Sequence, residues 1–129
     1  MSDNYLPIAP IHIEVETHYL PEQSIPMQHR YTFAYQITIR NDGKTPMTLR
    51  RRYWQITDDN QKVEVVQGAG VVGQQPTLDA DEAFIYASGA QLSTPYGQMG
   101  GYYVFEDAQG HTYRAPIAPF LLSIPRTLH

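Results

Sequence analysis

The chain has 129 residues, of which 42% are hydrophobic and 17% are charged, and its formal net charge is −4. This composition indicates one folded domain, and the acidic balance argues against binding to nucleic acid or to an anionic membrane. The absence of cysteine excludes disulfides, zinc–thiolate sites and a thiol nucleophile. No signal-peptide pattern opens the chain, and no apolar run approaches the ~20 residues of a membrane span. We therefore expect a soluble, cytoplasmic protein.

The first part of the chain predicts an arm followed by strands. Residues 1–10 contain two prolines and no hydrophobic period, which predicts a flexible N-terminal arm before a single domain at residues 11–129. Apolar and polar residues alternate over residues 11–19, as in a half-buried strand. The clearest alternation, YTFAYQITIRN, covers residues 31–41 and predicts a second strand.

Turn signals separate the strands that follow. The stretch NDGK at residues 41–44 has the composition of a hairpin turn, with Gly43 free to take a positive φ. A second turn is predicted at Asp58-Asp59-Asn60 and a third at Ala108-Gln109-Gly110. Between residues 89 and 101 we expect an exposed loop, a place where β-sandwiches often carry recognition residues. The further strands are expected near residues 47–57, 62–66, 82–88, 101–107 and 111–117, with a last apolar segment at residues 120–125.

This series of seven to nine short strands, with no helical period, predicts an all-β fold of two packed antiparallel sheets. A closed barrel is the alternative. The single tryptophan, Trp54, falls on the third strand, where an immunoglobulin-like sandwich carries its core aromatic residue.

The stretch GAGVVGQQP at residues 68–76 contains the spacing G-x-G-x-x-G of dinucleotide-binding turns. That mechanism needs a helix after the glycines, because the helix N-terminus binds the pyrophosphate. Here β-branched valines and Pro76 follow, and the next periodic segment is again a strand, so we do not expect a dinucleotide site of this type. Anion binding without a helix remains open as an alternative, in which glycine amides and the arginines at residues 50–52 bind the anion. The other reading is that the glycines shape bulges or close backbone contacts.

Four stretches in order identify a family resemblance: RRYWQITD, GAGVVGQQP, FIYASGAQLSTPYGQMGGYYV and IAPFLL. Together they resemble the bacterial ApaG family, also called CorD. The resemblance implies an immunoglobulin- or fibronectin III-like β-sandwich. It also implies links to cobalt resistance and magnesium efflux, without an established enzymatic activity. Related domains in eukaryotic proteins look like protein-interaction modules.

We therefore expect a non-enzymatic binding domain of the ApaG family with an unidentified protein partner. No catalytic residue and no cofactor is assigned, and we expect a monomer or a weak homo-oligomer. The first alternative is binding of pyrophosphate or another small phosphate-containing ligand through Gly68, Gly70, Gly73 and Arg52. The family resemblance carries this alternative, because a pyrophosphate role has been proposed for these glycines, and Arg52 matches the family's Arg-x-Trp pattern.

A second alternative is weak binding of a divalent metal along the first strand. His12, Glu14, Glu16 and His18 share one face of that strand, and these residue types bind metals. His12 and His18 stand ~20 Å apart on a strand and cannot share one ion. A solvated strand face is the simpler interpretation, and no metal ligand is assigned.

Two turns depart from the family pattern. The family usually has glycine after Asp-x-Asn, where this chain has Gln61, and Pro-Gly where it has Ala80-Asp81. Both departures affect turn geometry.

Overall fold

Alternating apolar and polar residues form eight β-strands in the computed structural model, which describes residues 3–125. The strands are β1 (Ile11–Tyr19), β2 (Tyr31–Asn41), β3 (Met47–Asp58), β4 (Val63–Ala69), β5 (Thr77–Leu78), β6 (Ala83–Leu92), β7 (Tyr96–Asp107) and β8 (Thr112–Ser123). Three short 3₁₀ helices accompany them: η1 (Asp3–Tyr5), η2 (Pro21–Gln23) and η3 (Pro26–Gln28). The all-β prediction is confirmed.

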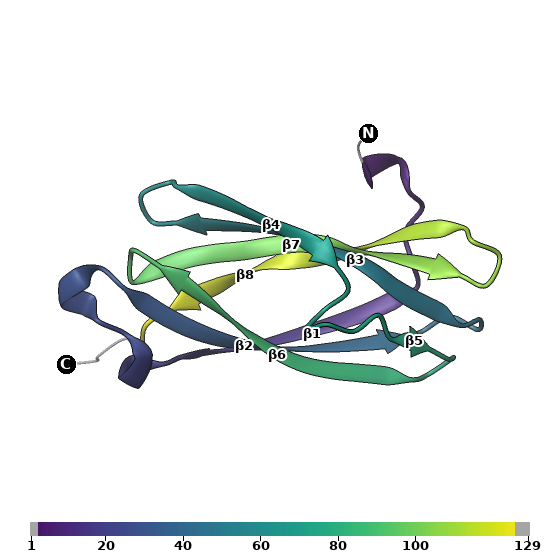
Figure 1. The fold of residues 1–129 in the computed structure, drawn as a ribbon, viewed down its shortest axis with the longest axis horizontal. Helices are drawn as coiled ribbons and strands as arrows, with labels where there is room; N and C mark the ends of the chain where they lie inside the picture. The colour runs from purple at the N-terminus through teal and green to yellow at the C-terminus, as the bar shows by residue number, and fades with distance from the viewer. Residues whose placement is uncertain (1–2, 126–129) are drawn as a thin grey trace.

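The strands form two antiparallel sheets. β2 lies between β1 and β6 in the smaller sheet, and the larger sheet has the order β4-β3-β7-β8, with β5 paired to β3. Figure 1 draws the larger sheet above the smaller one, with the long strands of both running across the view. Both sheets are open rather than closed on themselves, so the fold is a fibronectin III-like antiparallel β-sandwich and not a barrel.

The core lies between the two sheets. Phe33, Ile37 and Ile39 of β2 are fully buried, as the alternation predicted. Trp54 of β3 is only 2% exposed, and its ring meets the ring of Tyr103 edge to face at a centroid distance of 6.0 Å. The predicted core position of Trp54 is confirmed. Truncating a buried tryptophan typically costs about 3–5 kcal/mol, so this side chain is a main contributor to the stability of the sandwich.

The segment after β2 does not close a hairpin, so that prediction is wrong. β2 and β3 belong to different sheets, and the segment crosses between them. The buried Asn41 side chain fixes the crossing: its Nδ2 donates to the carbonyls of Thr45 (2.8 Å) and Leu78 (2.9 Å), and its Oδ1 accepts from the amide of Gly43 (2.9 Å). Gly43 does not take a positive φ; a Cβ there would lie 2.7 Å from Pro10 Cγ.

The β3–β4 turn is confirmed. The Asp58 carboxylate closes it by accepting the backbone amides of Asn60 and Lys62, each at 2.9 Å. Gln61 in this turn has φ +66°, and Asp81, before β6, has φ +67°. These are the two positions at which the chain lacks the family's glycine, so both carry a side chain in a backbone conformation that favours glycine.

The exposed loop predicted for residues 89–101 is also largely wrong. β6 continues through Gly89 to Leu92, and β7 begins at Tyr96, which leaves a turn of three residues. Met99 is buried instead of exposed. Gly97 interrupts the alternation of apolar and polar side chains because of close packing: a Cβ there would lie 2.8 Å from the carbonyl oxygen of Thr57. The glycine therefore allows close approach of neighbouring strands and does not mark a loop.

The described part of the N-terminal arm lies along β8. The amide of Ala9 donates to the carbonyl of Arg114, and the amide of Arg114 donates to the carbonyl of Pro7, both at 2.8 Å. Ala9 is buried in the core. The flexibility of residues 1–10 and the domain boundary at residue 11 stay predictions.

Candidate functional site

The glycine-rich segment forms the end of β4 and a tight turn. The amide of Val71 donates to the carbonyl of Gln74, and the amide of Gln74 donates back, both at 2.8 Å. The two residues between them, Val72 and Gly73, have φ values of +43° and +78°. Positive φ at both central residues is the requirement of a type I′ turn. The chain then continues to β5, and no helix follows these glycines, as the sequence predicted.

Gly70 is required by the path of the backbone. Its φ is +61°, and a Cβ there would lie 2.2 Å from the carbonyl oxygen of Gln74. Its amide donates to the carbonyl of Arg50 at 2.8 Å. The amides of Gly70, Val71 and Gln74 are thus already bound to carbonyls and do not point at a ligand. An anion nest needs such amides to be free.

Arg52 lies beside the same segment and binds its carbonyl groups. Its Nη1 donates to the carbonyl oxygens of Ala69 and Gly70, both at 3.0 Å. Gly68 is the cross-strand neighbour of Arg52, and a Cβ there would lie 3.1 Å from Nη1. The structure therefore brings Arg52, Gly68 and Gly70 together, as the family resemblance suggested, but with the guanidinium occupied by backbone oxygens. A Cβ at Gly73 would contact nothing within 4 Å.

The neighbouring arginines line an open depression of about 560 Å³ on the larger sheet. A register shift between Leu49 and Arg51 interrupts the alternation of β3 beside these arginines. Arg50 forms an ion pair with Glu106 at 2.9 Å. The depression is lined by Arg50, Arg51, Arg52, Gln67, Gly68, Ala69, Gln75, Val104, Glu106 and Thr112.

Asp3 connects the N-terminal arm to this region. Its carboxylate accepts two hydrogen bonds from the Arg51 guanidinium, at 2.8 and 2.9 Å, and one from the Tyr102 hydroxyl at 2.8 Å. Chiefly because of the Arg51 hydrogen bonds, the pKa of Asp3 falls to about 2. Burial, followed by the bond to Asp3, raises the pKa of Tyr102 to about 12. Sequence reasoning missed Asp3, because no local pattern links it to an arginine 48 positions away.

Tyrosine hydroxyls join the two sheets inside the core. The Tyr86 hydroxyl on β6 is hydrogen-bonded to the Tyr103 hydroxyl on β7. Burial raises the pKa values of Tyr86, Tyr103 and the neighbouring Tyr35, so all three are neutral near pH 7. These three rings are core residues and do not form an exposed stacking surface.

The histidine and glutamate residues of β1 form two separate pairs. His12 Nε2 lies 3.4 Å from Glu14 Oε1, and His18 Nε2 lies 3.3 Å from Glu16 Oε1. Within residues 3–125, no three His, Asp or Glu side chains gather as a metal site would require. The two pairs stay the only basis for the metal alternative.

The four long sheet edges differ in how they are protected. β1 is an edge strand of the smaller sheet, and it exposes Glu14, Glu16 and His18. β4 carries Glu64, and β8 carries two prolines and is bonded to residues 7–9 at its start. β6, with the sequence AFIYASGAQL, carries neither charge nor proline and pairs only with β2 within residues 3–125. Charges, prolines and covering segments are the usual means of blocking an edge, so β6 is the edge without them.

These features define the class of the protein, a fibronectin III-like β-sandwich domain. A family model described as the ApaG domain matches residues 21–107. The chain belongs to the ApaG family. None of the helices in the described part of the chain is long and apolar enough to cross a membrane.

Known proteins support this membership. Over 119 residues the chain is 53% identical to Protein ApaG of Shewanella woodyi, covering 92% of this chain and 94% of the relative. Protein ApaG of Xanthomonas campestris pv. campestris is 50% identical over the same length. These names specify no reaction.

Solved structures agree with the fold. A Bordetella pertussis protein solved under the name ApaA has a TM-score of 0.88 and 46% identity, covering 94% of this chain and 100% of that one. An Archaeoglobus fulgidus protein with a TM-score of 0.53 and 10% identity shares the fold alone.

Proposed function

We propose that this chain is a non-enzymatic, protein-binding domain that acts in the cytoplasm. The observation that carries the proposal is the β6 edge, which runs for ten residues without charge or proline. Ile85, near the start of this strand, presents an apolar side chain that is 59% exposed. An open edge of this kind supports the addition of a strand from a partner.

Polar groups around the arginine-lined depression and between the two sheets are engaged in the fold. The Asp3 carboxylate is bound by Arg51 and Tyr102, and the Arg52 guanidinium is bound by carbonyl groups. Tyr86 and Tyr103 are buried and neutral. This supports a binding role over a catalytic one, because general acids and bases need a free group with a pKa near the working pH.

Site-specific photo-crosslinking in cells tests the proposal. A photoreactive residue replaces Ile85 in one variant and Val65 in the other; Val65 is a similarly exposed apolar residue on β4, at the edge of the other sheet. We expect one polypeptide to be captured from Ile85 and not from Val65, and to bind the purified chain saturably. Capture without saturable binding, or substrate turnover that Arg52→Ala abolishes, would contradict the proposal.

A second candidate is binding of a small phosphate-containing ligand in the arginine-lined depression. The three neighbouring guanidinium groups favour it, since arginine binds phosphate with paired hydrogen bonds. The anion would have to replace Asp3 at Arg51 and Glu106 at Arg50. Calorimetry with pyrophosphate at moderate salt tests this candidate: saturable heat that Arg51→Gln removes would support it, and no heat would exclude it.

A third candidate is weak binding of a divalent cation by the His12–Glu14 or Glu16–His18 pair, in keeping with the family's link to cobalt. The short distances within each pair favour it. Cobalt titration of the wild type and of the His12→Ala/His18→Ala variant tests it. Identical titrations would exclude this candidate, and a binding signal lost in the variant would support it.

A further inference from the structure

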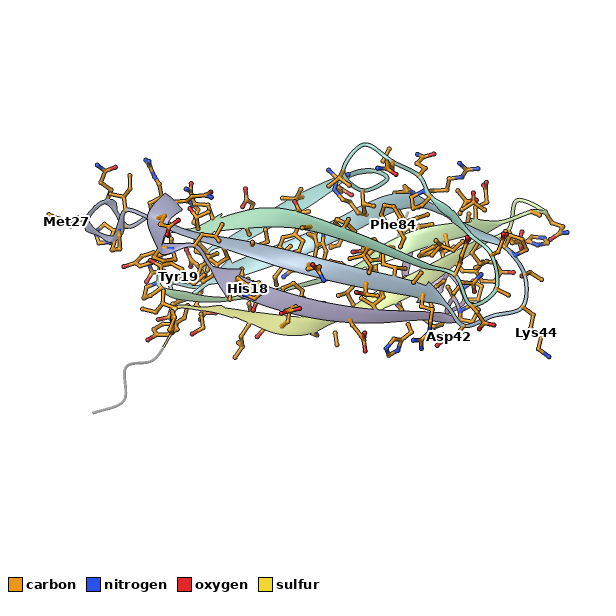
Figure 2. The ribbon with its side chains drawn as sticks, turned by 90° about the horizontal axis from the view of Figure 1, so that it is seen from below. His18, Tyr19, Met27, Asp42, Lys44 and Phe84 are labelled. Carbon is orange, nitrogen blue, oxygen red and sulfur yellow. The ribbon has the colours of Figure 1, made fainter. Side chains whose placement is uncertain are left out.

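The chemistry of a β6 partner can be inferred from what surrounds the edge, and this inference rests on the proposed function. Along β6 the backbone groups that face away from β2 have no strand to pair with in the described part of the chain. Figure 2 shows the three-stranded sheet from outside, with Phe84 beside its β6 margin. A strand added there would form main-chain hydrogen bonds with β6 and would point alternate side chains toward the larger sheet.

At the C-terminal end of β6, a pocket of about 230 Å³ opens between β6 and β4. Ile56 and Leu92, both buried, form its apolar part. Its polar lining includes Asp58, Lys62 and Glu64, so the carboxylates of the pocket outnumber its one ammonium group. A long aliphatic side chain with a cationic end suits such a pocket, because the stem can contact the apolar part while the cation stays near the carboxylate of Glu64.

At the N-terminal end of β6, the flanking segment is acidic. Asp79, Asp81 and Glu82 are all exposed there, just before the strand begins at Ala83. The nearest cation across the ladder is Arg40, opposite Ala83, and its guanidinium is already paired with Asp42 at 2.6 Å. Both ends of the free edge therefore favour positive charge on a bound segment.

We propose that β6 binds an extended basic segment of a partner protein, in which small or apolar residues alternate with lysine or arginine. The central part of the segment pairs with the uncharged middle of β6. One basic side chain lies in the pocket beside Glu64, and another lies near Asp81 and Glu82.

A second copy of this chain fits the edge less well. An edge of ten residues is ~33 Å long, and two such edges, each about 10 Å thick, bury roughly 660 Å² in total. A stable interface buries about 1,200 Å² or more. An antiparallel pair of β6 strands would also bring Asp79, Asp81 and Glu82 of one copy toward the pocket with Glu64 of the other, which places like charges together.

Amide-resolved NMR titration of the full ¹⁵N-labelled chain tests the inference with three peptides of eight residues. The basic peptide alternates valine with lysine, the acidic peptide alternates valine with glutamate, and the third is the basic peptide N-methylated on alternate residues to block strand pairing. We expect saturable shifts across β6 and at Glu64 with the basic peptide, weaker binding at higher salt, and at least tenfold weaker binding of the N-methylated peptide. Glu64→Gln should weaken binding about threefold, within the range of one exposed ion pair. The matched control, Glu14→Gln on the opposite edge of the smaller sheet, should have no effect.

The outcomes separate the inference from the proposed function. Equal binding of the acidic and basic peptides, or no shift in β6 with the basic peptide, overturns the inference that the bound segment is basic. The proposed function would still stand if the Ile85 crosslinker captured a saturable partner. Shifts in β6 that depend on protein concentration without peptide would assign the edge to a second copy and would also overturn the inference.

Discussion

Arg52 on β3 and Gly68 on β4 form one structural unit. The guanidinium of Arg52 lies where a side chain at residue 68 would stand, 3.1 Å from the position of a Cβ. From there it donates to the carbonyls of Ala69 and Gly70 at 3.0 Å each. The glycine makes room for the arginine, and the arginine holds the glycine turn against β3. This arrangement explains Gly68 without any ligand, and the close approach of the Gln74 carbonyl explains Gly70.

A double-mutant cycle measures the interaction free energy between Arg52 and Gly68. Gly68→Ala should destabilise the protein by about 1 kcal/mol, because the added methyl group displaces the guanidinium from its carbonyl partners. Arg52→Ala alone should cost about 2 kcal/mol through the lost charged hydrogen bonds. In the Arg52→Ala background, Gly68→Ala should be neutral or stabilising by about 0.5 kcal/mol, since glycine weakens a strand. Denaturant unfolding gives all four values, and additive effects would contradict the account.

The two turn positions without glycine should be sites of easy stabilisation. Gln61 and Asp81 have φ values of +66° and +67°, a region that costs most side chains about 1 kcal/mol. Gln61→Gly should raise the free energy of unfolding by about 0.5–1 kcal/mol, and Asp81→Gly by less, since aspartate tolerates this region better. Asn60→Gly, in the same turn without a positive φ, is the control and should not stabilise. Thermal unfolding measures each change.

The turn between Val71 and Gln74 carries a larger mismatch. Val72 is β-branched, has φ +43° and is 52% exposed, so its side chain gains little from packing. Asn-Gly is the preferred pair for a type I′ turn. Val72→Asn should therefore stabilise the protein by about 1 kcal/mol. Val65 is a similarly exposed valine on a strand, and Val65→Asn should destabilise the protein, because asparagine is unfavourable in strands. Stabilisation by both changes would argue against a strained turn.

The contact between Asp3 and Arg51 should make stability depend on acid pH. The pKa of Asp3 is about 2 in the folded chain against an ordinary value of 3.8. Because the folded-state pKa is the lower one, the contribution is complete above about pH 4 and is lost as the pH falls toward 2. At pH 7, Asp3→Asn should cost about 1 kcal/mol or less and should speed amide exchange at Ala9. At pH 2 the difference in unfolding free energy from wild type should be small. A difference that does not change with pH would contradict this role.

Most strands could be predicted because much of their length follows the two-residue period. β2 shows this best, with Phe33, Ile37 and Ile39 all buried. The missing helix after the glycines could also be predicted, from the valines and Pro76. Both inferences depend on neighbouring residues in the chain, whose effect on the backbone is local.

Long-range pairing could not be predicted in the same way. Asn41 has the composition of a turn residue, yet its side chain bonds to Leu78 and directs the chain into the other sheet. Asp3 reaches Arg51 across 48 positions. The length of β6 was underestimated because Gly89 resembles a loop signal, although it lies within the ladder opposite Ala34. The candidate binding edge depends on which strands remain unpaired, and that follows from sheet order alone.

Titration with pyrophosphate, followed at the backbone amides of the glycine segment, tests most directly whether this segment is a structural turn and not an anion site. The amides of Gly70, Val71 and Gln74 are bonded to carbonyls, and Arg52 is bonded to Ala69 and Gly70. We predict that these amide resonances do not move at millimolar pyrophosphate in moderate salt. Saturable shifts of these amides that disappear in Arg52→Ala would contradict the account.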